Sequence, residues 1–171
     1  MKQKPDVRIE AGVPESSVEV VSTKVAGPSL KSRALRYLAM REHSRAELET
    51  KLAPHAQSRQ ELAQALDELA AKGLQSDART SQAVARSGAA RYGNARITAK
   101  LREKGVAPEL IHEALAELEE DELARATAVW QRKFGEFATD AKEKARQMRF
   151  LMGRGFSQAT IYRVMRDAQE R

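Results

Sequence analysis

Apolar side chains recur every three to four residues from position 30 almost to the end of the chain, with polar side chains between them. Leu30, Ala34, Leu35 and Leu38 form the first such stripe. This period is typical of helices that bury one face. Residues 1–28 show no sustained period and are interrupted by proline and glycine, so we expect a flexible tail there.

The apolar pattern returns about every 50 residues. Three leucines, 49 and 50 residues apart, each precede a large aliphatic residue ten positions later; the pairs are Leu52 and Leu62, Leu101 and Ile111, and Leu151 and Ile161. A further apolar residue follows four positions after each second member, on the same face of a helix. Offsets that match in three copies indicate an internal repeat.

Each copy predicts a helix, a turn and a second helix. Gly105 and Gly155 follow their leucine anchors by four residues and are expected to adopt the left-handed conformation that ends a helix. The next helix then starts at once. In the first copy Ser58 is the expected N-cap and Glu61 the expected partner in a capping box, whereas Pro108 suits the first helical position of the second copy.

A third helix precedes each pair, at about 30–42, 77–91 and 120–134. A unit of three short helices is too small to bury its apolar faces alone, so neighbouring units are expected to stack. The sequence therefore predicts an all-α protein, an elongated, curved array of three tandem three-helix repeats. After the tail of residues 1–28, we place these repeats at 29–76, 77–118 and 119–171.

Composition narrows the possible functions. The sequence has no cysteine, which excludes disulfides and thiolate metal sites. It also lacks the apolar core of a signal peptide and any run of about 18 apolar residues, so we expect a soluble, cytoplasmic protein without a membrane partner. No phosphate-binding loop, HExxH or GxSxG motif occurs and the three histidines lie far apart, so we expect no enzyme activity, cofactor or metal.

Charge provides the main functional signal. The formal net charge is +6, and the bases gather in residues 79–104 and 142–166, on either side of the acidic stretch 109–122. Such blocks suit an anionic partner, although a solvated surface is the alternative. The candidate binding residues are Arg86, Arg91, Arg96, Lys100, Arg102, Lys104, Lys142, Arg146, Arg149, Arg154 and Arg163.

Two pairs of these bases occupy equivalent repeat positions. Arg96 corresponds to Arg146, and Lys104 to Arg154, whereas the first repeat has Glu47 and His55 at those places. The second and third repeats are therefore expected to project positive charge in similar directions. Nearby aromatic residues, including Phe150, Trp130 and Phe134, are interpreted mainly as core, with base stacking by Phe150 as the alternative.

The stretches RYGNARITAKLREKGVAPELIHEAL (91–115) and KEKARQMRFLMGRGFSQATIYRVM (142–165) resemble the RecX family of bacterial recombination regulators. The resemblance extends over about residues 30–168, and its distinctive parts include Tyr92-Gly93 and Gly155-Phe156-Ser157. It implies three tandem three-helix repeats. It also implies binding to RecA filaments on single-stranded DNA, with inhibition of RecA ATPase, strand exchange and coprotease activity, in homologous recombination, DNA repair and the SOS response.

The leading hypothesis is thus a monomeric, non-catalytic regulator of RecA, which contacts single-stranded DNA directly or through RecA. The main rival is a helical-repeat protein that binds nucleic acid independently of RecA. A generic scaffold is the third hypothesis, and it should tolerate reversal of the basic charges.

Overall fold

The structure, a computed structural model, describes residues 27–170, and every regular element in that part is helical. The elements are α1 Leu30–Met40, α2 Arg45–Leu52, the short 3₁₀ turn η1 Ala53–His55, α3 Arg59–Ala71, α4 Asp77–Ala89, α5 Asn94–Glu103, α6 Pro108–Ala116, α7 Glu122–Lys133, α8 Ala141–Gly153 and α9 Gln158–Gln169. The all-α prediction is confirmed. Residues 1–26 of the predicted tail lie outside the described residues. None of the described helices is long and apolar enough to cross a bilayer.

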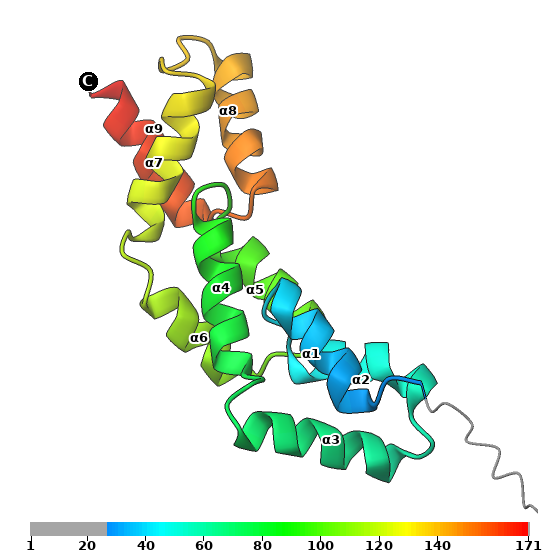
Figure 1. The fold of residues 1–171 in the computed structure, drawn as a ribbon. Coiled ribbons are helices and arrows are strands. Elements are labelled where there is room, and N and C mark those ends of the chain that lie inside the picture. Colours follow the sequence, from blue (N-terminus) through cyan, green and yellow to red (C-terminus); the bar gives the residue numbers. More distant parts are fainter. Residues whose placement is uncertain (1–26, 171) are drawn as a thin grey trace, which may run out of the picture.

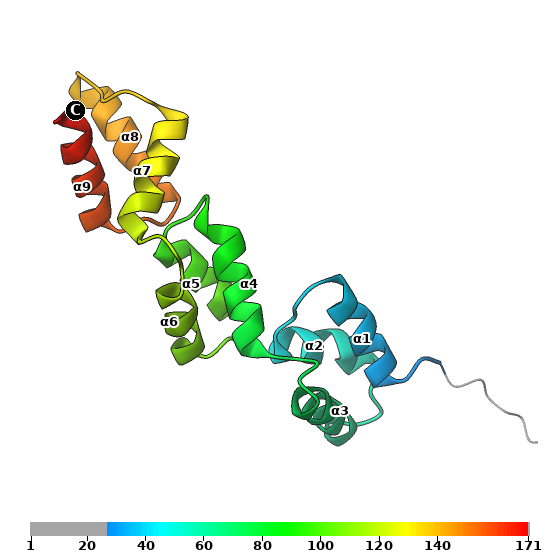
Figure 2. The same cartoon turned by 60° about the vertical axis from the view of Figure 1, so that its left-hand side comes forward.

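The helices form three successive units, α1–α3, α4–α6 and α7–α9, which follow one another along a curve (Figures 1 and 2). Each unit has its own buried cluster; representative members are Leu66 in the first, Leu101 in the second and Trp130 in the third. The principal helix-to-helix packing lies within the units. This confirms the elongated array of three-helix repeats. The predicted limits fall between α3 and α4 and between α6 and α7.

The turns within the repeats show how the glycines act. Gly105 and Gly155 have φ angles of 71° and 81°, in the left-handed region. The residue after each glycine donates a backbone hydrogen bond to the carbonyl of the leucine anchor. In the second repeat, Val106 N donates to the Leu101 carbonyl at 3.1 Å. The same bond in the third repeat runs from Phe156 to Leu151.

One local prediction is wrong. The Ser58 hydroxyl accepts a hydrogen bond from the Glu61 N–H, but the Glu61 carboxylate accepts from Gln57 N, one residue before the N-cap. The capping box is therefore incomplete there. A complete box stands at the start of α2, where Ser44 and Glu47 each cap the other's backbone N–H.

The first and second repeats meet through a turn. The Lys104–Gly105 turn abuts the N-terminus of α2, where the Ser44 hydroxyl donates to the Lys104 carbonyl. A Cβ on Gly105 would lie 2.6 Å from the Cβ of Ala46, so only glycine fits. Asp77, at the start of α4, accepts a hydrogen bond from the N–H of Arg45 at 2.8 Å.

The second and third repeats meet in the same way. The Arg154–Gly155 turn abuts the N-terminus of α5, where Gly93 N donates to the Arg154 carbonyl at 2.9 Å and Ala95 N to the Gly155 carbonyl at 3.2 Å. Glu122, at the start of α7, accepts from Asn94 N at 2.8 Å. Each turn glycine therefore ends a helix of its own repeat. Because it has no side chain, it also leaves room for the start of a helix in the preceding repeat.

Candidate functional site

The second repeat separates positive from negative charge. Helix α5 carries Arg96, Lys100 and Arg102 against the single acid Glu103, whereas α6 carries two glutamates and no lysine or arginine. Both helices pack against α4. One flank of α4 is therefore basic, and the other is acidic.

Two adjoining hollows follow the basic flank, between α4 and α5. The first, of about 430 Å³, is lined by Arg41, Lys100 and Lys104 among others, and the second, of about 370 Å³, by Arg91, Arg96 and Lys100. They share Val84, Ser87 and Lys100 along their walls. Together they form a groove whose charged lining is mainly positive.

The positive line continues across the junction into the third repeat. The Arg154 guanidinium donates to the Arg91 carbonyl at 3.2 Å and lies over the Phe150 ring, 4.6 Å from its centroid. Phe150 in turn meets the edge of Phe134, with ring centroids 5.2 Å apart, and the Arg146 guanidinium lies 5.9 Å from the Phe134 centroid. Arginines and aromatic rings therefore alternate along this line.

The same alternation occurs on the second-repeat side. Tyr92 is half-buried, and the guanidinium of Arg96 lies 4.5 Å from its ring centroid, while that of Arg91 lies at 5.7 Å. Such stacking restrains long side chains that would otherwise lose rotamer freedom on binding. We refer to the whole line as the basic row; its residues are Lys104, Lys100, Arg96, Arg91, Arg154 and Arg146.

Most of the basic row is electrically uncompensated. Lys104 pairs with Glu47, and Arg146 pairs with Glu143 at 3.1 Å. The other four bases have no carboxylate partner among residues 27–170. Of these four, Arg154 is half-buried and the other three are exposed. They can therefore attract an anionic surface without first breaking an ion pair.

Lys104 serves the repeat junction. Its side chain is 15% exposed, and its ammonium contacts the Glu47 carboxylate, which also accepts from Arg41 at 2.9 Å. Burial alone would raise the pKa of Glu47, but hydrogen bonds from Arg41, Lys104 and the Ser44 backbone outweigh it and lower the pKa to about 2. The carboxylate therefore stays ionised and holds both cations.

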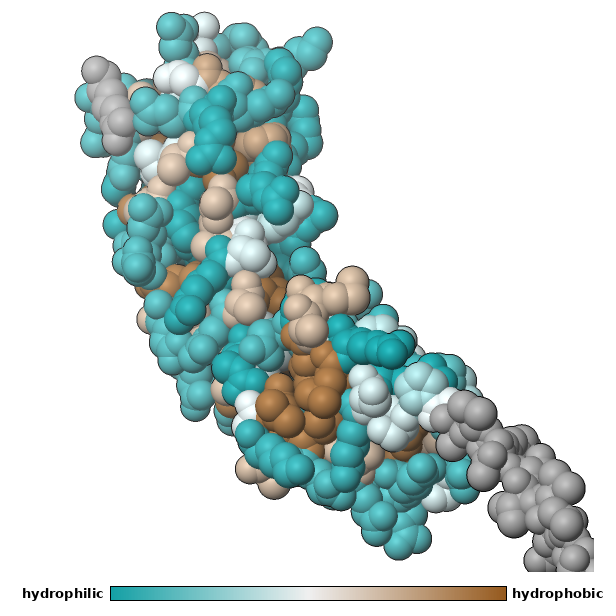
Figure 3. All heavy atoms as spheres, viewed as in Figure 1, coloured by the Kyte–Doolittle hydropathy of each residue, from teal (hydrophilic) through white to brown (hydrophobic). Residues whose placement is uncertain are grey.

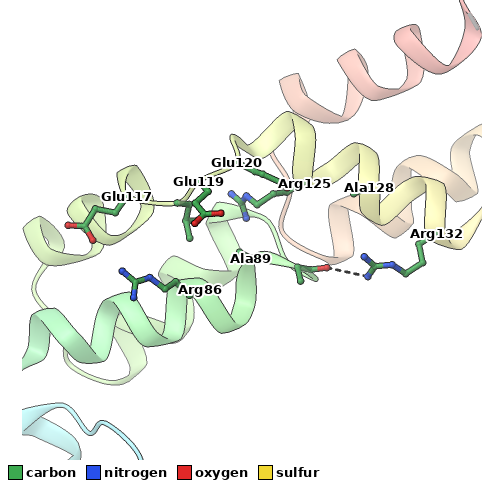
Figure 4. Close-up of a pocket in the computed structure, with 10 residues that line it drawn as sticks. Arg86, Ala89, Glu117, Glu119, Glu120, Arg125, Ala128 and Arg132 are labelled. Atoms are coloured by element: carbon green, nitrogen blue, oxygen red, sulfur yellow. Dashed lines mark hydrogen bonds between the residues drawn. The ribbon is translucent and has the colours of Figure 1, made fainter.

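The other predicted candidates lie outside the basic row. Arg86 lines a separate hollow of about 600 Å³ on the far flank of α4, where it faces the α6–α7 linker with Glu117 and Glu119 (Figure 4). That hollow mixes both signs of charge, so it suits a polyanion less well. Four further candidates are exposed and line none of the hollows described above, namely Arg102, Lys142, Arg149 and Arg163.

Comparisons with known proteins identify this architecture. Family models of the second and third RecX three-helix domains match residues 76–115 and 119–165. The regulatory protein RecX of Herminiimonas arsenicoxydans is 49% identical over 142 residues, 83% of this chain and 94% of that protein. That of Leptothrix cholodnii is 50% identical over 140 residues, 82% and 89% of the two chains. The chain belongs to the RecX family.

The fold agrees with this RecX membership. The crystal structure of RecX from Lactobacillus salivarius superposes with a TM-score of 0.72 at 17% identity, covering 83% of this chain and 96% of that one. Membership places the chain among regulatory proteins. The Tyr92-Gly93 motif of the RecX resemblance lies where the second and third repeats meet. The Tyr92 ring contacts the guanidinium groups of two arginines of the basic row, and the Gly93 N–H donates a hydrogen bond across the junction.

Sequence reasoning missed several basic side chains that lie beside the basic row of this RecX-family chain. Arg41 lines the first hollow, and Arg132 and Lys133 line a smaller one, of about 130 Å³, beside Arg154. They lie outside the two basic blocks, so only tertiary proximity reveals them. Arg125 was also overlooked: it is buried, donates to the Tyr92 carbonyl at 3.0 Å, and has a pKa lowered by burial.

The aromatic residues behave mainly as packing elements. Trp130 is buried and its indole N–H donates to the Gln147 side chain at 2.9 Å, while Phe134 and Phe150 pack against the same cluster. His43 is buried against Tyr37, and its Nδ1 contacts the Arg41 carbonyl at 3.0 Å. Packing therefore accounts for the ring of Phe150, which is covered by Arg154 on one side.

Proposed function

We propose that this chain binds the RecA filament on single-stranded DNA and lowers RecA ATPase, strand-exchange and coprotease activities. Membership of a family of regulatory proteins supports a regulatory role. The observation that carries the proposal furthest is the basic row, which crosses from the second repeat into the third where Arg154 donates to the Arg91 carbonyl, beside a hollow lined by bases and no acid.

The geometry of the basic row suits an extended anionic partner. Its bases come from α5 and α8, from the turns that follow these two helices and from the α4–α5 loop, so the positive surface extends over two repeats. A nucleoprotein filament presents phosphates and acidic side chains at repeated intervals along its axis. An elongated array with regularly placed bases can contact several of these at once, and each contact adds to a salt-dependent attraction.

The decisive experiment measures RecA ATP hydrolysis on single-stranded DNA with and without this chain. The rate is expected to fall as the chain is added, and to recover at high salt because the attraction is screened. An unchanged rate at saturating chain concentration would overturn the proposal.

Charge-reversed variants connect the effect to the basic row. Arg91→Glu with Lys100→Glu is expected to weaken filament binding at least tenfold, because both bases are exposed and lack carboxylate partners among the described residues. Arg102→Glu with Arg163→Glu removes the same total charge outside the hollows and is the matched control. Equal losses in the two variants would mean that only net charge matters.

The rival function, binding of nucleic acid without RecA, makes a different prediction. It requires affinity for bare single-stranded DNA at least equal to that for RecA filaments. Titration of both partners at the same salt concentration separates the two, since affinities for nucleic acid depend steeply on salt.

A further inference from the structure

The first repeat has a surface unlike the basic row. Three of its large apolar side chains are exposed: Leu35 at 43%, Met40 at 81% and Leu74 at 42%. Figure 3 shows the largest group of hydrophobic residues on this face over the first repeat, with mostly hydrophilic residues around it. Single exposed leucines are common in monomers, but a local group of them marks an interaction site more often.

Arg79 links the two chain segments that carry Met40 and Leu74. The Arg79 guanidinium bonds both the Leu74 carbonyl, at 3.2 Å, and the carboxylate of Glu42, which follows closely after Met40. Ala39 is exposed and lies one turn after Leu35, on the same face of α1. We call Leu35, Ala39, Met40 and Leu74 the apolar patch.

The apolar patch adjoins the beginning of the basic row. Met40 directly precedes Arg41, and Arg41 lines the hollow that also contains Lys100 and Lys104. The patch therefore ends one residue before a base that shares a hollow with two members of the basic row. Exposed aliphatic side chains of the first repeat thus precede the bases of the second and third.

Three bases at this end of the first repeat are paired with carboxylates. Salt bridges join Arg41 to Glu47 at 2.9 Å, Arg45 to Asp67 at 2.7 Å and Arg79 to Glu42 at 2.8 Å. Helix α2 carries equal numbers of acids and bases. These three bases are therefore already paired, whereas four members of the basic row have no carboxylate partner among the described residues.

We propose that the apolar patch docks on the protein component of the filament, on an aliphatic RecA surface bordered by carboxylates, while the basic row faces the anionic groove. This rests on the proposed function. Aliphatic side chains favour a protein surface, because unstacked bases are bound by aromatic rings and the patch has none. The acidic border follows from α1, where Lys31 pairs with Glu68 but Arg33 and Arg36 have no carboxylate partner among the described residues.

The test compares two double variants of the full chain for binding to labelled RecA filaments and to bare oligo(dT). Met40→Ser with Leu74→Ser alters the patch. Met152→Ser with Tyr162→Ser alters side chains that are 54% and 55% exposed in the third repeat, and is the matched control. The single variant Met40→Ser, at the most exposed position, accompanies them because it leaves the core intact. Circular dichroism confirms the helical content of each.

The patch variant is expected to bind filaments about tenfold more weakly than the unaltered chain, and Met40→Ser alone several-fold more weakly, with oligo(dT) affinity unchanged. The control should retain both affinities. Equal filament binding by patch variant and unaltered chain would overturn the docking proposal alone. If the patch variant also lost oligo(dT) binding, the patch would be a nucleic-acid site. If the unaltered chain formed a dimer that the variant abolished, the patch would bind a second copy of the chain. Either result would overturn the docking proposal. If the unaltered chain bound no filament, the proposed function would fail first.

Discussion

Replacing Gly93 with alanine should loosen the joint between the second and third repeats. Gly93 has φ −78° and ψ 170°, a conformation that alanine adopts freely, so backbone strain plays no part. A Cβ there would lie 2.2 Å from the Gly155 carbonyl oxygen and 2.4 Å from Phe156 N. Both are backbone atoms, which cannot rotate away, so the two repeats must separate.

The cost follows from two contributions. Forced displacement of packed atoms costs about 1–3 kcal/mol. Separation also weakens the backbone hydrogen bonds from Gly93 N to Arg154 and from Ala95 N to Gly155, which contribute about 1 kcal/mol each. We expect a loss of about 3 kcal/mol in the free energy of unfolding, or a melting temperature lower by about 6–12 °C.

Chemical denaturation followed by two probes tests this expectation. Trp130, the one tryptophan of the chain, reports on the third repeat, whereas far-ultraviolet circular dichroism reports on all helices. In Gly93→Ala the tryptophan transition should precede the loss of helix, because a detached repeat is less stable alone. Gly153→Ala, where a Cβ meets no atom within 4 Å, is the control. Coincident transitions at the midpoint of the unaltered chain would refute the reasoning.

Two further predictions concern charge. Glu47→Gln should destabilise the chain by roughly 2 kcal/mol at pH 7, because Arg41 and Lys104 lose their shared carboxylate. Folding depresses the pKa of Glu47 from 4.5 to about 2, so this stabilisation is complete above about pH 4.5 and disappears as the pH falls towards 2; urea titrations at pH 7 and pH 2 should show the variant's deficit vanish. Arg146→Glu with Arg149→Glu should weaken filament binding without unfolding α8, as measured by anisotropy and circular dichroism; normal regulation of RecA by this variant would contradict a role for α8.

The helices and the repeat could be predicted from the sequence because both follow from the spacing of apolar residues and glycines along the chain. An apolar period near 3.6 residues requires a helix with a buried face, and a glycine four residues after Leu101 or Leu151 stops that helix wherever the rest of the chain lies. Because the same small unit recurs and cannot bury its apolar faces alone, neighbouring units were expected to stack. Each helix inference uses residues within about ten positions of one another, and the repeat follows from finding the same offsets again about 50 residues further along the chain.

The surface depended on contacts between distant residues. Equivalent repeat positions suggested that Lys104 and Arg154 have one role, yet Lys104 pairs with Glu47 in the junction whereas Arg154 lies over Phe150. Arg86 and Arg91 are only five residues apart in the sequence, but they line different hollows, on opposite flanks of α4.

The sequence by itself determined the helices, their ends and their threefold recurrence, since short-range sterics and periodic burial decide those features. Only the tertiary structure decided which bases form one line, which are neutralised by acids, and that Arg41, next to the exposed Met40, shares a hollow with Lys100 and Lys104. The physical reason is that charge pairing and exposure depend on distances across repeats. Those distances are set by how each glycine turn fits against the helix start of the repeat before it.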